Sequence, residues 1–192
     1  MSDANFEANL SNATERSAAL STKLRSACRT IRIATTLWAM WNFGVYAWVW
    51  SDRDALLARQ AKLYGLDPTT VTDIRYWSAS ALEFVSWLVS LIVVFRVWRL
   101  TRAYLDGRVF TMEAASRLRD VALAGLMATA VDAVLGPLSG ALVLNDLLGR
   151  VPVYYWFNPT YLLYALMSGF LLALSVVFES AAEVANENAQ FV

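Results

Sequence analysis

The chain of 192 residues is 58% hydrophobic and 13% aromatic, whereas an ordinary soluble domain is about 45–50% apolar. Its 16 Lys and Arg residues balance 16 Asp and Glu residues, it has no histidine, and its one cysteine is Cys28. This composition excludes a His-ligated haem, a His-containing metal site, a His general base and an intrachain disulfide, and it is typical of an integral membrane protein.

Four long apolar runs cross the chain, at residues 33–50, 77–98, 120–144 and 159–178. A helix of about 18 or more apolar residues is long enough to cross the ~30 Å hydrocarbon core of a bilayer. We therefore predict an all-α, polytopic membrane protein. A four-helix transmembrane bundle would occupy residues 30–178, with residues 1–29 and 179–192 outside the bilayer. The polar start and the length of the first run predict a retained anchor rather than a cleaved signal peptide.

The N-terminal segment, residues 1–29, has few large apolar side chains. Towards its end, five residues of low polarity recur at helical spacing: Leu20, Leu24, Ala27, Cys28 and Ile31. The pattern indicates a short amphipathic helix that lies along the inner membrane surface and leads into the first span. A solvated helical lead-in without a partner is the alternative.

Basic residues gather on one side of the predicted membrane layer. Eleven flank the first run or lie between the second and third runs: Arg16, Lys23, Arg25, Arg29, Arg32, Arg96, Arg99, Arg102, Arg108, Arg117 and Arg119. Five lie on the opposite side: Arg53, Arg59, Lys62, Arg75 and Arg150. Because positive residues near the ends of spans stay cytoplasmic, we expect both termini and the central loop in the cytosol of a bacterium, with the protein in the inner membrane.

The two outer loops carry structure of their own. Residues 51–54, Ser-Asp-Arg-Asp, resemble an N-cap with an acidic first turn, and Gly65 suits a helix stop. This predicts a helix over residues 54–64 that carries Leu56, Leu57 and Leu63 towards the membrane or the mouth of the bundle. The second outer loop contains an aromatic strip, residues 151–157. We expect this strip to cover the bundle at the interface, with a ligand site as the alternative.

The cytosolic loop between the second and third spans contains two helix-end signals. Gly107 suits the left-handed conformation that ends a helix, and Thr111 can cap the next one, with Glu113 favourable in its first turn. Beyond the fourth run, the tail places Glu183 and Glu187 on one helical face. These carboxylates are expected to pair with the loop arginines or to receive a partner.

Two carboxylates fall inside the apolar runs. At 1.5 Å per residue, Glu83 lies about 22 Å and Asp132 about 19 Å from the inner ends of their helices, so antiparallel helices bring them to a similar depth. Three further polar residues fall in this layer: Asn42, Tyr164 and Ser168. No Lys, Arg or His occurs there. Because their helical neighbours are small or polar, both acids are predicted to point into the bundle.

This intramembrane polar layer has two interpretations. Acids inside a membrane mark proton-linked or ligand-binding pockets. The plainer interpretation is a hydrogen-bonded layer that fixes the register of the helices. The second is favoured by the sequence, because four helices rarely enclose a useful path alone.

The segment 107–119 reads GRVFTMEAASRLR: a glycine, then an aromatic residue followed by Thr, then a helix bearing Leu-Arg. It resembles the signature of a bacterial membrane family, the domain-of-unknown-function family numbered 2975. The tail from Phe178 to Glu187 is similar to the acidic ending of that family, although residues 189–192, AQFV, replace its more common acidic-then-Leu-Thr ending. The resemblance implies the four-helix plan, and a membrane partner or regulator of a short helix-turn-helix protein. It implies no activity and no site residues.

Three functions follow from these patterns, and none is enzymatic, because the chain has no phosphate-binding glycine loop, nucleophile elbow or metalloprotease helix. The first is a binding or regulatory protein that acts through a cytosolic partner face: Gly107, Arg108, Phe110, Thr111, Arg117, Arg119, Glu183 and Glu187. The second is a small transporter or channel subunit, oligomeric, that uses Glu83 and Asp132. The third is an accessory subunit of a larger membrane complex. We expect no cofactor, no metal and no direct contact with nucleic acid.

Overall fold

The computed structural model describes residues 3–65, 67–107, 111–144 and 158–190, with side chains at positions 22–184 and 187 within these ranges. Every regular element in this part of the chain is helical, as the sequence predicts: α1 (Asp3–Ser51), α2 (Arg53–Tyr64), the 3-10 helix η1 (Pro68–Thr70), α3 (Asp73–Leu105), α4 (Met112–Leu144) and α6 (Pro159–Gln190).

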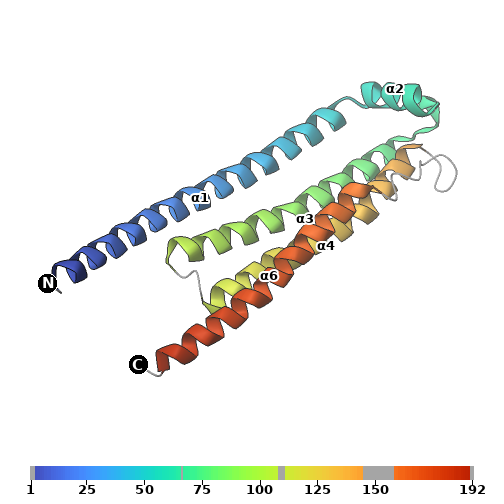
Figure 1. Cartoon of the computed structure of the whole chain (residues 1–192). Helices are drawn as coiled ribbons and strands as arrows, with labels where there is room; N and C mark the ends of the chain where they lie inside the picture. The colour runs from blue at the N-terminus through green and yellow to red at the C-terminus, as the bar shows by residue number, and fades with distance from the viewer. Residues whose placement is uncertain (1–2, 66, 108–110, 145–157, 191–192) are drawn as a thin grey trace.

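The four long helices form an open row (Figure 1). α1 packs against α3, α3 against α4, and α4 against α6, whereas α1 and α6 share no extensive interface in the described part of the chain. These contacts do not confirm the predicted four-helix bundle, because the described helices pack one after another in a row. Figure 1 also shows both chain ends and the α3–α4 connection at one end of the molecule, which we call the terminal end, and α2 at the other, the α2 end.

Most of the apolar surface of the long helices faces outward. Among the described residues, three helices are long and apolar enough to cross a bilayer: α3, α4 and the part of α6 from Pro159 to Val184. Only 11%, 22% and 11% of their most apolar windows are buried within the protein. A soluble domain would bury such stretches, so these helices indicate a membrane protein. The first predicted span, 33–50, is not among the three, because Trp, Thr, Tyr and Asn side chains reduce its mean hydropathy.

Two apolar clusters close the row at its ends. At the α2 end, Leu57 of α2, Val71, Tyr76 and Ala79 near the start of α3, and Val143 of α4 are buried together. At the terminal end, a second cluster contains Leu100 of α3 with Leu118 and Val121 of α4, against which α6 places Leu171, Leu174 and Phe178. The stretches of α3 and α4 between these clusters carry the polar residues that line the site described below.

An aromatic seam holds α1 against α3. The rings of Phe43 and Trp87 are 4.9 Å apart, and those of Trp50 and Tyr76 are 5.2 Å apart. The Trp87 indole also donates a hydrogen bond to the carbonyl oxygen of Ala39 at 3.2 Å. Towards the terminal end, the guanidinium of Arg32 lies 4.7 Å above the ring of Trp98. Because the seam continues from 32 to 50 on α1, that stretch runs beside most of α3.

α1 is one continuous helix from residue 3 to residue 51. The predicted boundary at residues 29/30 thus lies inside α1, and the expected surface segment and the first span share one helix.

The helix ends confirm the predicted signals. Asp52 accepts a hydrogen bond from Ala55 N and caps α2, which ends at Gly65 with φ of 64°. Gly107 takes φ of 80° after α3, and the hydroxyl oxygen of Thr111 accepts from Ala114 N at 3.2 Å at the start of α4. Glycine suits the two positive φ angles because it has no Cβ to clash there.

Contacts of its first residue, Arg53, hold α2 in place. Arg53 donates to the carbonyl oxygen of Val71 at 2.5 Å and lies 3.4 Å from the carboxylate of Asp73. Leu57 is buried beneath α2, whereas Leu63 is 63% exposed. The helix therefore covers the α2 end of the row through its first two turns.

We predict that Cys28 reacts slowly with N-ethylmaleimide. The thiol is buried, burial raises its pKa, and Arg32 offsets this only in part. The thiolate is the reactive form, and a raised pKa leaves less of it near neutral pH, so the reaction should be slow there. The reaction rate should keep rising with pH after the rate of an ordinary thiol has levelled. The control is Thr30→Cys, an exposed position, in a Cys28→Ser background. Equal rates at the two positions would show that Cys28 is not buried.

Candidate functional site

A cavity of about 840 Å³ lies among α1, α3, α4 and α6, with Leu56 and Gln60 of α2 at one side of it. We call it the central cavity. Its lining includes all five residues of the predicted polar layer: Asn42, Glu83, Asp132, Tyr164 and Ser168. The sequence placed these residues at one depth, and the structure also brings them around one space.

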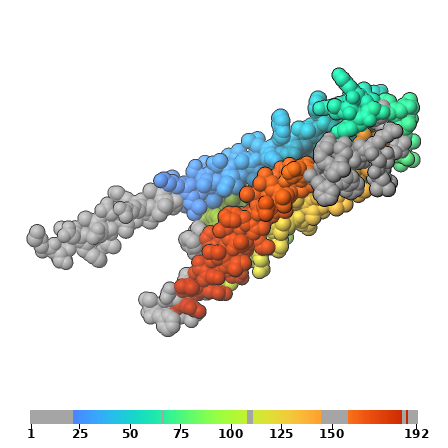
Figure 2. Space-filling model, turned by 45° about the vertical axis from the view of Figure 1, so that its right-hand side comes forward, coloured from blue at the N-terminus to red at the C-terminus, as the bar shows by residue number. Residues whose placement is uncertain are grey.

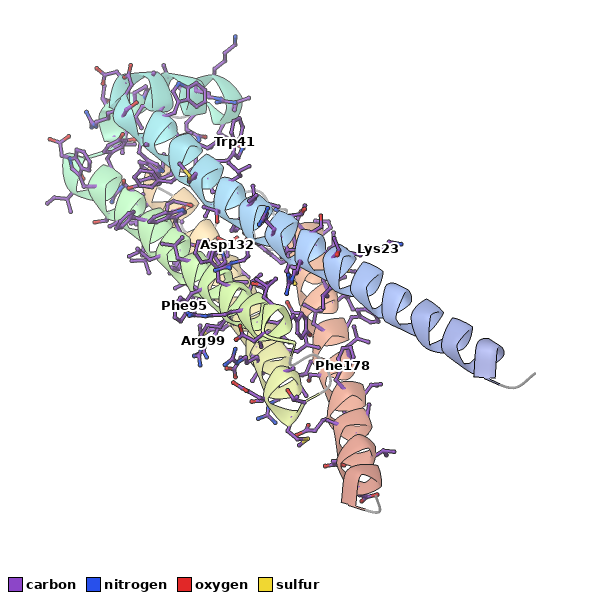
Figure 3. The ribbon with its side chains drawn as sticks, turned by 90° about the vertical axis from the view of Figure 1, so that its left-hand side faces the viewer. Lys23, Trp41, Phe95, Arg99, Asp132 and Phe178 are labelled. Atoms are coloured by element: carbon purple, nitrogen blue, oxygen red, sulfur yellow. The ribbon has the colours of Figure 1, made fainter. Side chains whose placement is uncertain are left out.

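Two carboxylate–serine hydrogen bonds join α3 to α4 beside the cavity. Glu83 of α3 is bonded to Ser139 of α4 through its Oε1. In the reverse sense, Ser86 of α3 donates to Oδ1 of Asp132 on α4 at 2.7 Å. Each helix thus supplies one carboxylate and one hydroxyl. In Figure 3, Asp132 lies within the layer of helices, while Phe95 and Arg99 point away from it on the outer side of α3.

The number of hydrogens around Glu83 favours the neutral acid. The Ser139 hydroxyl lies 2.8 Å from the carbonyl oxygen of Gly136 as well as against Glu83. A hydroxyl has one hydrogen to donate. If Glu83 is ionised, Ser139 can satisfy only one of these two acceptors. If Glu83 carries a proton, the acid donates to Ser139 and Ser139 donates to Gly136, so both contacts become hydrogen bonds.

The other three residues of the predicted layer play different parts. Asn42 donates its side-chain amide to the carbonyl oxygen of Trp38 on its own helix, at 2.8 Å. Ser168 is buried where α6 approaches α4, and Tyr164 is 51% exposed at the edge of the cavity. Among the described residues, then, the hydrogen bonds of the layer that join two helices are those between α3 and α4, and Asn42 is bonded within its own helix.

Sequence reasoning missed several lining residues. Ser139 lies seven positions after Asp132, two helical turns along the same face, so its position could have been inferred from spacing. Tyr161 lies about one turn before Tyr164, the first predicted layer residue of α6. Gln60 could not have been found this way, because its place over the cavity depends on how α2 folds back.

The lining carries acids without bases. No Lys or Arg of the described residues lines the cavity, and the chain has no histidine. The nearest arginine towards the terminal end of α3, Arg96, forms a 2.8 Å ion pair with Asp120 of α4. In the described part of the chain, no three His, Cys, Asp or Glu side chains are grouped so that they could hold a metal ion.

The cavity opens sideways, between α1 and α6. Three side chains of its lining are at least half exposed there: Trp38 (50%), Tyr164 (51%) and Met167 (56%). In Figure 2, α1 and α6 run along the same face of the molecule and diverge towards the terminal end. The opening therefore follows from the open row, because no helix joins its two edges.

Comparison with known proteins places the chain in a family. The model of the family described as "Protein of unknown function (DUF2975)" matches residues 69–192. The chain belongs to the DUF2975 family. No curated protein and no solved structure gives a significant match. The DUF2975 region contains α3, α4 and α6, and thus both carboxylates and both serines of the α3–α4 bonds, whereas α1 and α2 precede it.

The predicted cytosolic partner face of this DUF2975 chain is only partly available. Arg117 is bonded to Glu113 on its own helix and donates to the carbonyl oxygen of Arg99 at 2.9 Å. The side chains of Arg119, Glu183 and Glu187 are exposed. The expected pairs between the tail carboxylates and these arginines do not occur among the described residues.

The remaining members of that face divide into two groups. Gly107 and Thr111 are occupied in ending one helix and starting the next. Arg108 and Phe110 lie outside the described residues, as does the aromatic strip 151–157.

We predict that Gly125→Ala loosens the packing of α6 on α4. A Cβ at Gly125 would lie 2.5 Å from Oγ of Ser168 but 3.5 Å from its Cβ. Overpacking of this kind costs about 1–3 kcal/mol, so the midpoint of thermal unfolding in detergent should fall. Adding Ser168→Ala should restore most of the loss, because only the hydroxyl oxygen clashes. Gly169→Ala is the control, since nothing lies within 4 Å of its added Cβ. A double variant no more stable than Gly125→Ala would contradict this packing.

Proposed function

We propose that this protein is a four-span protein of the bacterial inner membrane that binds a small solute in the central cavity and couples binding to a proton on Glu83. The proposal includes no bond-breaking chemistry. The observation that carries it is a cavity of about 840 Å³ that two carboxylates line without a cation among the described residues.

The proposed fourth span is residues 33–50 of α1. Contacts between α1 and α3 run from Arg32–Trp98 to Trp50–Tyr76. At 1.5 Å per residue, the stretch 32–50 is about 27 Å long and the stretch 76–98 about 33 Å. α1 thus extends over most of the thickness that α3 crosses. Large apolar side chains of this stretch are exposed, including Leu37 (60%) and Met40 (66%). These features support placing α1 in the hydrocarbon together with α3.

The size and opening of the cavity support a binding site over a layer that only fixes register. Small-molecule sites in proteins are typically about 300–1,000 Å³ and combine apolar walls with a few polar groups. A layer whose only role is register needs contacts between helices but no such space. Ionisable groups inside a membrane protein also mark ion or substrate pathways by default.

We predict that Ser86→Cys, in a Cys28→Ser background, is modified by a water-soluble cationic methanethiosulfonate reagent. Ser86 lines the cavity, whereas Ile92 of the same helix is 39% exposed outside the cavity lining and serves as the control position. Cavity water and the nearby carboxylates should make the cationic reagent react faster than its anionic counterpart at position 86, with no such preference at position 92. A cysteine at 86 that is as unreactive as one at 92 would mean that the polar layer is closed, and the proposed function would fail.

A second candidate function acts at the terminal end. Both chain ends and the α3–α4 connection lie there (Figure 1), and Arg119, Glu183 and Glu187 are exposed without an ion pair among the described residues. Exposed groups of both signs favour a protein partner that binds through charge, and a helix-turn-helix regulator or a larger membrane complex would fit. This role requires the terminal end to face the cytosol, which the excess of basic residues on that side supports.

The orientation is tested by labelling intact cells with a membrane-impermeant maleimide, again in a Cys28→Ser background. Leu63→Cys of α2, an exposed position, should be labelled from outside. Arg119→Cys and Glu187→Cys should be labelled only after the cells are permeabilised. External labelling at 119 or 187 would reverse the topology and remove the second candidate function.

A further inference from the structure

Several hydrogen-bond acceptors at the central cavity have no partner among the described residues. Each carboxylate has one of its two oxygens bonded to a serine, which leaves the other oxygen without a partner among the described residues. The side-chain oxygen of Gln60 is buried at the cavity wall, also without a partner there. Asn42 donates one amide hydrogen to Trp38, and its side-chain oxygen has no partner among the described residues. A ligand that donates hydrogen bonds or carries positive charge would complete this set.

Aromatic rings from three helices share the lining with these acceptors. They are Trp38, Tyr46 and Trp50 of α1, Trp87 of α3, and Tyr161 and Tyr164 of α6. The negative face of an aromatic ring attracts a cation, most strongly where water is excluded. Rings around two carboxylates therefore favour a cation that is large and partly apolar over a small hydrated ion.

We propose that the ligand of the central cavity is a lipophilic organic cation, which enters from the bilayer through the opening between α1 and α6. This inference rests on the proposed function and names its substrate class. The size of the cavity, about 840 Å³, suits a drug-sized molecule. The half-exposed edge residues Trp38 and Tyr164 form a route that does not pass through either apolar cluster. A lipophilic cation concentrates in the membrane and can reach this opening sideways.

Binding exchanges one proton for one cation. In the empty cavity the acid of Glu83 donates to Ser139; when the cation arrives, the O–H bond of Glu83 breaks, the proton leaves to water, and the carboxylate faces the cation. The net charge of the cavity does not change. The titratable groups that share the described lining with Glu83 are all acids: Tyr46 from α1, Asp132 from α4, and Tyr161 and Tyr164 from α6. α2 contributes the neutral Gln60. A neighbouring base that could replace the ligand's charge is thus missing from the described lining.

The test measures binding of tetraphenylphosphonium to the full chain in lipid nanodiscs, against tetraphenylborate, an anion of the same shape. We expect saturable binding of the cation and none of the anion. Affinity for the cation should fall as the pH is lowered, because protons compete for Glu83. Glu83→Gln and Asp132→Asn should each weaken binding at least about tenfold, or about 1.4 kcal/mol, and Glu83→Gln should also flatten the pH dependence. Asp54→Asn, an exposed carboxylate outside the cavity, is the control and should change nothing.

Each outcome of these measurements supports or overturns the substrate class, the site or the proposed function. Equal binding of cation and anion, or binding of neither, overturns the substrate class even if the carboxylate variants fail to fold, because this comparison uses the natural chain. Binding that Glu83→Gln and Asp54→Asn weaken equally overturns the site. If position 86 reacts with the cationic reagent while tetraphenylphosphonium does not bind, the cavity remains a binding site for another solute. If position 86 is unreactive, both the proposed function and its substrate class fail.

Discussion

The structure depends on how two carboxylates are accommodated among apolar helices. Such a group needs a partner inside the protein, because hydrocarbon offers none. Here the solution is reciprocal: Glu83 of α3 is bonded to Ser139 of α4, and Asp132 of α4 to Ser86 of α3. The two bonds fix the central helix pair in position and in register. Among the described residues they use one oxygen of each carboxylate, so the same residues that hold α3 to α4 keep acceptors available at the cavity that they line.

The outer helices join this pair by different means, and the difference creates the cavity. α6 approaches α4 closely, where Ser168 lies over Gly125, a residue with no side chain to keep it away. α1 is kept further out by bulky rings, because its seam with α3 is made of Phe43, Tyr46 and Trp50 against Trp87, Phe84 and Tyr76. Because α6 packs closely on α4 while aromatic rings hold α1 further from α3, the row of helices does not close on itself. Its two apolar clusters seal the ends, and polar space remains between them.

The helix ends and the depth of the two carboxylates could be predicted from the sequence, because they depend on residues close together along one helix. The cap at Asp52, the left-handed stops at Gly65 and Gly107, and the depth of Glu83 and Asp132 depend on spacing along single helices. Ser139 was within reach of the same reasoning, two turns from Asp132. The open row could not be predicted from the sequence, because it depends on which helix faces which. Aromatic residues on α1 are as compatible with a lipid-facing surface as with a contact between helices. The position of Gln60 could not be predicted from the sequence either, because it depends on the contacts of Arg53 with Val71 and Asp73, which bring α2 back over the cavity.

The reciprocal pattern has a consequence for how the chain enters the membrane. All four residues that neutralise the polar stretch belong to one helical hairpin, α3 and α4, joined by residues 106–111. Neither α1 nor α6 is needed to make these bonds. The hairpin can therefore shield its own acids while it is being inserted, before the last helix has left the ribosome. A slip of α3 along α4 by one turn, about 5.4 Å, would break both of these bonds together, so both bonds favour the same alignment of the hairpin.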